Sequence, residues 1–291
     1  MTRIIQSLAD VARDYDALFC DLWGCLHNGV APFPAAVAAL QSFRAGGGKV
    51  ILVTNAPRPK SSVVRQLDAM GLPRDTWDDV ATSGDAAQAA MLRGAVGHRI
   101  HHIGAEKDEP FFAEFEPDLA DLAQTANLTR VPLAEAEGVV CTGLAHDLTE
   151  TPADYRAALL LAKTRGLKML CANPDIVVDM GDKRLYCAGA LAKAYEEMGG
   201  EALYYGKPHP PIYDLARRRL GLEEPRILCV GDGIGTDVAG GVAEGLDTLF
   251  VTGGLAAAEF GPDPENPDSG LLDLWLNRHQ LSATLAIGHL R

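Results

Sequence analysis

Residues 17–21 read ALFCD and residues 227–232 read ILCVGD. Each stretch is an apolar run of strand length that ends at an acidic residue, Asp21 in the first and Asp232 in the second. Short apolar runs that alternate with longer helical stretches are typical of βα units that build a mostly parallel sheet. The sequence therefore predicts an α/β fold with carboxylates at the carboxyl ends of two of its strands.

The rest of the chain continues this alternation. Strands are predicted at 17–20, 50–53, 100–103, 139–142, 168–171, 202–205, 227–230 and 248–251. Helices are predicted at 34–44, 60–70, 85–93, 152–165, 188–198, 210–220 and 237–244. The tail beyond Gly261 opens with a loop rich in Pro and Asp and continues into an amphipathic stretch at 271–281, which indicates a structural segment.

Charge and composition exclude several classes of partner. Asp and Glu outnumber Lys and Arg by 39 to 26, a formal net charge of −13 that repels nucleic acid and anionic membranes. No apolar run approaches the roughly 20 residues that cross a bilayer, and charged residues interrupt the amino-terminal stretch where a signal peptide would be apolar. We expect a cytoplasmic protein of about two domains, or of one core with a large insertion. The cysteines form no C-x-x-C pair, and the four in or beside strand-like runs, Cys20, Cys141, Cys171 and Cys229, are expected to be small buried hydrophobes.

Polar residues follow four of the predicted strands. Besides Asp21 and Asp232, Thr54 and Asn55 follow one strand, and Lys207 comes soon after another. Because ligands bind at the carboxyl ends of the strands in open parallel sheets, we expect these side chains to converge. Taken singly, each has an ordinary structural interpretation, such as a turn aspartate, a helix cap or a solvated lysine. Their combination in one chain favours a site.

In this order the motifs resemble those of the haloacid dehalogenase-like (HAD) hydrolases. The matching segments are 21–24 (DLWG), 54–55 (TN), 206–208 (GKP) and 231–237 (GDGIGTD). The stretches HNG at 27–29 and ANPD at 172–175 are similar to one branch, subfamily IIA, which includes pyridoxal phosphate, phosphoglycolate and nitrophenyl phosphatases. That resemblance implies a Rossmann-like core with an inserted α/β cap domain and a small phosphate ester as substrate.

The resemblance also assigns roles to these residues. Asp21 is the expected nucleophile, which would form an aspartyl-phosphate and split one difficult displacement into two easier ones. Lys207 would offset negative charge, and Thr54 and Asn55 would bind phosphate oxygens. For Mg²⁺, which prefers a few hard oxygen ligands, the implied ligands are Asp21, the backbone carbonyl of Trp23, and Asp232, with Asp237 behind them.

The spacing between the motifs indicates where the cap domain is inserted. The interval between Thr54 and Lys207 has room for a whole domain, whereas the interval between the first two motifs holds little more than one helix. We predict a discontinuous core at 1–95 and 203–291 and a cap at 96–202. By resemblance, Asn173 and Asp175 contact the substrate, although an Asx-Pro turn explains the same residues. Relatives of this branch pair through their caps, which implies a homodimer.

One residue departs from the phosphatase pattern. Two positions after the nucleophile the family usually carries an aspartate that acts as general acid and base, and this chain carries Trp23. Loss of such a group removes about 10²–10⁴-fold in rate, or roughly 3–5 kcal/mol of barrier lowering. The implied metal ligand at this position is a backbone carbonyl and is retained. His27 is a candidate replacement because histidine titrates near neutral pH; the alternative is a histidine of the loop.

Trp23 also leaves two other functions open. Haloacid dehalogenases carry an aromatic residue at this position and need no general acid, but their cap lies between the first two motifs and they do not need the acids at 232 and 237. A binding protein for phosphate ligands that has lost its chemistry is the other alternative. Turnover with Mg²⁺ that is abolished by Asp21→Asn distinguishes the enzyme from the binding protein.

Overall fold

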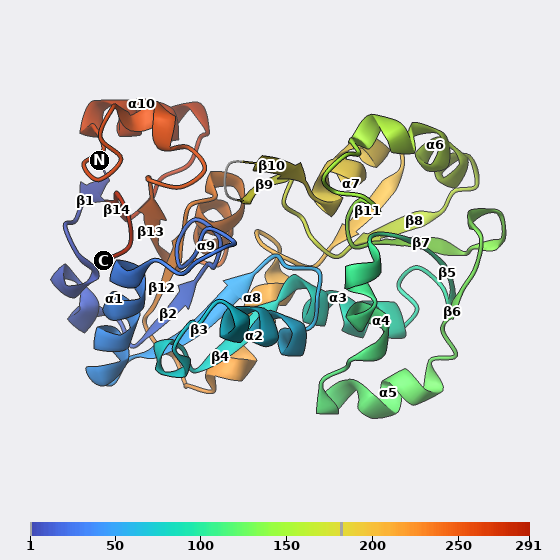
Figure 1. Cartoon of the computed structure of the whole chain (residues 1–291), viewed down its shortest axis with the longest axis horizontal. Coiled ribbons are helices and arrows are strands. Elements are labelled where there is room, and N and C mark those ends of the chain that lie inside the picture. The colour runs from blue at the N-terminus through green and yellow to red at the C-terminus, as the bar shows by residue number, and fades with distance from the viewer. Residues whose placement is uncertain (1, 181–182) are drawn as a thin grey trace.

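The computed structural model describes residues 2–180 and 183–291 and contains two parallel sheets (Figure 1). All neighbouring strands of the first sheet run parallel. In spatial order these are β1 (Arg3–Ile4), β14 (Leu285–Ile287), β13 (Asp247–Val251), β12 (Ile227–Gly231), β2 (Ala17–Cys20), β3 (Lys49–Thr54) and β4 (Asp79–Thr82). The chain passes from β2 to β3 on one side and returns as β12 on the other, so β2 lies at the switch in strand order where α/β sheets bind ligands.

The second sheet comes from the middle of the chain and is also parallel. Its spatial order is β11 (Glu201–Tyr204), β8 (Lys168–Cys171), β7 (Gly138–Cys141), β5 (Arg99–Ile103) and β6 (Thr129–Arg130). A separate antiparallel hairpin, β9 (Val177–Met180) and β10 (Lys183–Tyr186), lies between the two sheets in the view of Figure 1. The predicted α/β class with mostly parallel sheets is confirmed.

Ten α-helices surround these sheets within the described ranges. They are α1 (Pro34–Ala45), α2 (Lys60–Ala69), α3 (Ser83–Leu92), α4 (Pro110–Ala113), α5 (Ala120–Thr125), α6 (Arg156–Thr164), α7 (Ala188–Glu197), α8 (Pro210–Leu220), α9 (Ala239–Ala243) and α10 (Ser269–Arg278). The amphipathic tail forms α10, whose apolar side packs on β13 and β14. The tail is therefore the structural segment that its pattern indicated.

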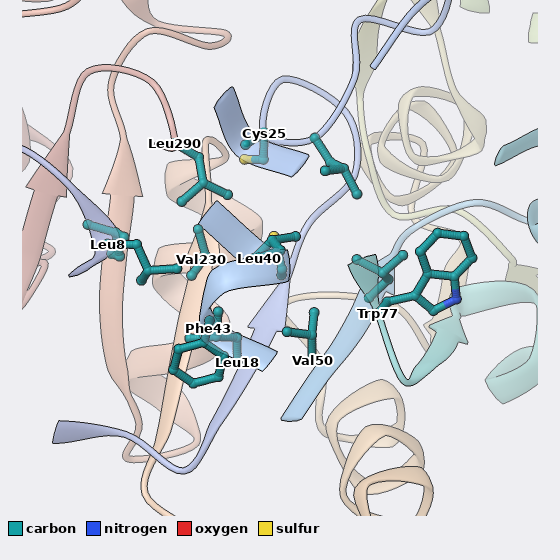
Figure 2. Packing of buried hydrophobic residues seen from close by; sticks show 14 of the residues in the cluster. Leu8, Leu18, Cys25, Leu40, Phe43, Val50, Trp77, Val230 and Leu290 are labelled. Carbon is teal, nitrogen blue, oxygen red and sulfur yellow. The ribbon is translucent and has the colours of Figure 1, made fainter. Parts of the chain in front are cut away.

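Alternate residues of the central strands enter two different cores. Leu18 and Val50 face α1 and α2 and pack in the same cluster as Phe43 of α1 (Figure 2). Phe19 and Ile51, each one position later, face α8 on the other side of the sheet. This period of two follows from the alternation of side chains along a strand. Because both faces are buried, the strands are apolar throughout, as is usual in parallel sheets.

The second sheet is covered in the same way. Val139 and Cys141 of β7 pack with α6 and α7, whereas Val140 packs with α3 and α4. Helix α3 precedes the second sheet in the chain, yet its residue Met91 packs in the core of that sheet. The same helix contacts α8, which packs on the first sheet. Helix α3 therefore connects the packing of the two sheets.

Each predicted strand is present and agrees with the observed bounds to within one residue. The strands that the sequence did not reveal are β1, β4, β6, β9, β10 and β14, which are short or mixed in polarity. Two helices begin later than predicted, because a 3₁₀ turn occupies 152–155 before α6 and a π turn occupies Ile234–Val238 before α9, and α3 begins two residues earlier than predicted, at Ser83.

One expectation about the strands was wrong. Lys207 was predicted to follow a strand of the same sheet as Asp21, but the strand before it, β11, pairs with β8 in the second sheet. Lys207 lies instead in the connection from β11 to α8, and α8 packs on the first sheet. The lysine thus reaches the first sheet through this crossing connection.

None of the described helices is long and apolar enough to span a membrane. All six cysteines are buried and free, which confirms the prediction made for the four at apolar runs, Cys20, Cys141, Cys171 and Cys229.

Candidate active site

A buried ion pair brings the predicted nucleophile and lysine together. Lys207 Nζ lies 2.7 Å from Asp21 Oδ1 and 2.7 Å from Asp237 Oδ1. Lys207 is only 3 % exposed, so these carboxylates, rather than water, stabilise its charge. Burial alone would lower the pKa of Lys207, but the charges of Asp21, Asp237 and Asp175 raise it well above its usual value. The lysine is therefore a permanent cation beside Asp21.

Asp21 is positioned by the first sheet. Its backbone N–H donates to the carbonyl of Val230 at 2.8 Å, which continues the pairing of β2 with β12 beyond the end of β2. Burial raises the pKa of the Asp21 carboxyl, and Lys207 opposes that rise. The lysine thus favours the ionised carboxylate, which is the form that acts as a nucleophile.

Asn55 connects three segments of the site. Its Oδ1 accepts from the backbone N–H of Lys207 at 2.7 Å, and its Nδ2 donates to the Lys207 carbonyl at 3.1 Å and to Asp175 Oδ1 at 2.8 Å. An amide nitrogen has two N–H groups, and both are used here. These bonds indicate that the Asn55 side chain positions Lys207 and Asp175, and a contact of Asn55 with phosphate stays a prediction.

Thr54 retains a free donor. It is the last residue of β3, it is 2 % exposed, and its Oγ1 accepts from the backbone N–H of Ala56 at 3.2 Å. No described residue accepts the hydrogen of this hydroxyl, and Thr54 lines the same cavity as Asp21. The geometry therefore fits the predicted contact with a phosphate oxygen.

A group of potential metal ligands lies beside this pair. One carboxylate oxygen each of Asp21 and Asp232 and the Sγ of Cys25 all lie within 4.8 Å of one another. Asp232 Oδ2 accepts from the backbone N–H of Leu255 at 2.9 Å, and Gly24, at φ +74°, leaves the space that Asp232 needs, because a Cβ there would be 2.1 Å from Asp232 Oδ2. Burial and the charges of Asp21 and Asp237 raise the pKa of Asp232 well above its usual value. Buried carboxylates in excess of nearby cations fit a divalent cation.

The backbone around Trp23 leaves its carbonyl free. His27 N–H donates to the Leu22 carbonyl and Gly24 N–H donates to the His27 carbonyl, each at 3.0 Å. These bonds pass on either side of Trp23, and no described residue donates to the Trp23 carbonyl. A free carbonyl next to Asp21 is compatible with the predicted third ligand.

Asp237 lies behind these groups. Its Oδ2 accepts from the backbone N–H of Gly233 at 3.1 Å, within the π turn, while its Oδ1 contacts Lys207. Burial and the charge of Asp21 raise its pKa to about 6, against the effect of Lys207. Asp237 does not belong to the group formed by Asp21, Cys25 and Asp232. It therefore holds the lysine, in agreement with its predicted place behind the ligands.

Of the two interpretations of His27, the structure favours a histidine that supports the loop. His27 is 1 % exposed, and burial lowers its pKa to about 4. Its Nδ1 accepts from the backbone N–H of Gly29 at 3.0 Å, and its ring packs edge-on against Trp23. The imidazole is neutral at physiological pH and supports the loop.

A cavity of about 420 Å³ opens next to Asp21 and Thr54. Its wall includes Trp23, Asn173 and Asp175. The Asx turn at the last two is present, because Asn173 Oδ1 accepts from the backbone N–H of Asp175 at 3.0 Å. Both residues nevertheless border the cavity, so the turn and the predicted contact with a substrate are compatible.

Trp23 borders two cavities. It lines the 420 Å³ cavity and a second cavity of about 190 Å³, which also includes Asp232. Asp21 and Asp175 likewise line both. Asp21 is therefore accessible from the side of the acidic group and from the side of the larger cavity.

Sequence reasoning missed part of the cavity wall. Arg58, Asp108 and Thr142 line it, and none belongs to a motif that the sequence singled out. Arg58 lies only four positions after Thr54, on the same loop, which was the one available signal. Thr142 ends the strand predicted at 139–142, and Asp108 follows the one predicted at 100–103, but neither residue resembles a motif of the site.

Comparisons with known proteins agree with this arrangement. Residues 18–116 match a family described as haloacid dehalogenase-like hydrolase, and residues 204–277 match one described as HAD-hydrolase-like. A solved hydrolase of the haloacid dehalogenase-like family from Brucella suis is 39 % identical over 99 % of this chain and 100 % of its own, with a TM-score of 0.84. The 5'-nucleotidase YutF of Bacillus subtilis is 24 % identical over 90 % of this chain and 96 % of its own. Glycerol phosphate phosphatase from Mycobacterium tuberculosis, solved in complex with magnesium, is 27 % identical over 89 % and 74 %, with a TM-score of 0.62.

Proposed function

Because the chain belongs to the haloacid dehalogenase-like hydrolases of subfamily IIA, we propose that it is a Mg²⁺-dependent phosphohydrolase of small phosphorylated metabolites, of the sugar or three-carbon phosphate type. The observation that carries the proposal is the Asp21 carboxylate, held by Lys207 at a cavity of metabolite size and next to a second buried acid, Asp232. The relatives that act on phosphate esters support the same chemistry.

The chain's own residues divide the work of phosphoryl transfer. An oxygen of Asp21 forms a bond to phosphorus while the bond to the alcohol oxygen breaks, and water then releases phosphate from the aspartyl-phosphate. Lys207 offsets negative charge throughout, and the Thr54 hydroxyl donates to a phosphoryl oxygen. Asn55 holds the lysine in place.

The acidic group fits a divalent cation. Asp21, Asp232 and the Trp23 carbonyl would hold Mg²⁺, with Asp237 behind them. When bound, the ion neutralises charge on the transferring phosphoryl group. The neutral Cys25 thiol, whose pKa burial raises well above its usual value, is not among the proposed ligands.

Trp23 removes the proton donor for the leaving group from the reaction. An indole provides no proton to an alkoxide leaving group, and neutral His27 does not replace it. Aryl phosphates need less protonation of the leaving group than alkyl phosphates. The enzyme should therefore cleave aryl esters more readily, and alkyl esters about 10²–10⁴-fold more slowly than an enzyme with an acid at this position.

The division into domains is part of the proposal. Two separate sheets and a cavity lined from both support a core at 1–95 and 203–291 and a cap at 96–202, except that the boundary at 202/203 falls within β11 of the second sheet. Closure of the cap would exclude water from Asp21. The homodimer and the cytoplasmic location stay predictions from the sequence.

The test is hydrolysis of an aryl phosphate and an alkyl phosphate, with and without Mg²⁺, by the wild type, Asp21→Asn and Trp23→Asp. Aryl cleavage that needs Mg²⁺ and disappears with Asp21→Asn, together with a gain on the alkyl ester in Trp23→Asp, is the expected result. If no variant turns over either ester, the phosphatase proposal fails. Binding of phosphate esters without turnover would then favour the binding protein, and release of halide from a haloacid would favour the dehalogenase.

A further inference from the structure

The segment after β14 is hydrogen-bonded to the loop after β13. The Gly288 carbonyl accepts from the backbone N–H of Gly253 at 2.7 Å. The Ile287 carbonyl accepts twice from Thr252, from its backbone N–H at 2.8 Å and from its hydroxyl at 3.0 Å. The two strands are neighbours in the first sheet (Figure 1), so their pairing continues past their ends. We refer to residues 252–256, which follow β13, as the β13 loop.

The β13 loop lies directly against a proposed ligand of the cation. Leu255 donates its backbone N–H to Asp232 Oδ2 at 2.9 Å. Gly254 approaches the same oxygen so closely that a Cβ there would be 2.1 Å from it. The loop also lines the cavity of about 190 Å³ next to Asp21. A shift of the β13 loop would therefore change how the Asp232 carboxylate is held.

The side chain of His289 connects the β13 loop to a second loop. Its Nε2 lies 3.1 Å from the carbonyl oxygen of Gly253, and its Nδ1 lies 2.7 Å from Glu265 Oε1. The ring packs on the β13 loop itself, because a Cβ at Gly253 would be 2.5 Å from Nε2. Glu265 belongs to the loop rich in Pro and Asp that precedes α10. The histidine therefore holds two segments that are not consecutive in the chain.

Both partners of His289 can only accept hydrogen bonds. A backbone carbonyl and an ionised carboxylate have no hydrogen to donate, so both ring nitrogens must carry one for the two bonds to form. Only the imidazolium form of histidine has two N–H groups. The other carboxylate oxygen of Glu265 contacts the guanidinium of Arg291, so the acid lies between two cations. The bridge to the β13 loop is thus made by a charged histidine.

Resting on the proposed function, we infer that His289, as the imidazolium, is a positioning residue for the cation site, because it fixes the β13 loop that orients Asp232. The Gly253 carbonyl and the Leu255 N–H belong to consecutive planar peptide groups, which only the two torsions of Gly254 separate. Groups that orient a metal ligand change metal affinity without touching the ion. The side chain of His289 is 37 % exposed and that of its acidic partner is 51 % exposed, so this pair adds little to stability. Its effect is expected in cation affinity.

The first experiment titrates Mg²⁺ into the full chain by calorimetry, for the wild type, His289→Gln and His279→Gln. Glutamine has one donor nitrogen and no charge, so the dissociation constant of His289→Gln should rise about three- to ten-fold. The Mg²⁺ concentration for half-maximal aryl phosphate hydrolysis should rise equally, while kcat at saturating Mg²⁺ stays within about two-fold. His279 is the matched control, because its Nδ1 contacts the Trp275 carbonyl at 2.9 Å at the end of α10. Its variant should bind Mg²⁺ like the wild type.

Hydrogen exchange of the metal-free proteins is the second experiment, and it guards against a folding defect. Residues 252–258 should exchange faster in His289→Gln than in the wild type, whereas α10 should exchange at the same rate in both. Unchanged Mg²⁺ affinity or unchanged exchange of the β13 loop would refute this inference alone, and so would equally faster exchange of α10. A wild type that binds no Mg²⁺ and hydrolyses no ester would refute the proposed function as well.

Discussion

Replacing Lys207 by methionine removes the one cation of the described residues that contacts Asp21 and Asp237, at 2.7 Å from each. Breaking a buried ion pair on one side costs about 3–5 kcal/mol, because the remaining charges stay buried. For 291 residues, an unfolding entropy of about 2.1 cal/mol/K per residue amounts to ~0.6 kcal/mol/K. Lys207→Met should therefore lower the melting temperature by about 5–8 °C at pH 8 without metal.

The loss in melting temperature of Lys207→Met should be larger at pH 8 than at pH 5. The folded-state pKa of Asp237 is raised from 3.8 to about 6, so the folded protein takes up protons there more readily than the unfolded chain, and the stability that this gives is present at low pH and lost as pH rises through about 6. Removing Lys207 raises that pKa further, because the lysine is what opposes the rise. At pH 5, protonation of Asp237 therefore removes part of the uncompensated buried charge in Lys207→Met. Its loss in melting temperature relative to the wild type should be smaller there than at pH 8.

Scanning calorimetry of the full chain at pH 5 and pH 8 measures both effects. Lys49→Met is the matched control: Lys49 Nζ contacts Asp78 at 3.2 Å with 48 % of the lysine side chain exposed, and a surface pair contributes about 0–1 kcal/mol. Its melting temperature should change by less than about 2 °C at either pH. A Lys207→Met protein that melts with the wild type at pH 8, or that shows the same deficit at both pH values, would refute the electrostatic argument.

Three further outcomes follow from the same electrostatics. Arg219→Met removes the guanidinium 2.8 Å from Asp85, which is 4 % exposed, and should lower the melting temperature by about 5 °C or more; an unchanged melting curve would contradict it. His27→Gln should leave the pH profile of kcat/KM unaltered between pH 5 and 8, since the imidazole with its pKa of about 4 is already neutral; a lost or shifted limb would show that His27 titrates in the reaction. Asp232→Asn should melt no lower than the wild type without metal, because it removes a buried charge, and should lose the rise in melting temperature that Mg²⁺ gives the wild type; a retained rise would place the metal elsewhere.

The central strands could be predicted from the sequence, because strands that are buried on both faces are apolar throughout. Strands β2, β3 and β12 are of this kind, and the polar residues at their ends were correctly expected to meet. The β9–β10 hairpin was missed because it pairs only with itself and its residues are partly or fully exposed. Lys207 was placed correctly near Asp21 for a wrong reason, since the strand before it belongs to the other sheet.

Contacts between distant segments were beyond the sequence. Nothing around Asp108 reveals that it meets Thr142 thirty-four positions later, or that it borders the same cavity as Arg58. The pKa of His27 was misjudged for a similar reason, because its value depends on burial that the tertiary structure imposes. Asn55 was recognised as a residue of the site, but the hydrogen bonds that use its amide come from residues more than a hundred positions away.

The acidic group itself argues for chemistry rather than for structure. Asp21, Asp232 and Asp237 are each at most 9 % exposed, and Lys207 is the single cation in contact with any of them within the described chain. Buried carboxylates in excess of their counterions destabilise a fold, so stability does not account for this arrangement, whereas a bound divalent cation does. Trp23 leaves the group of potential cation ligands intact, because its backbone carbonyl remains free and only the side chain lacks a proton donor for the leaving group. The substitution therefore separates binding of cation and phosphate, which the free carbonyl and the acids would still allow, from protonation of the leaving group, which the indole does not provide.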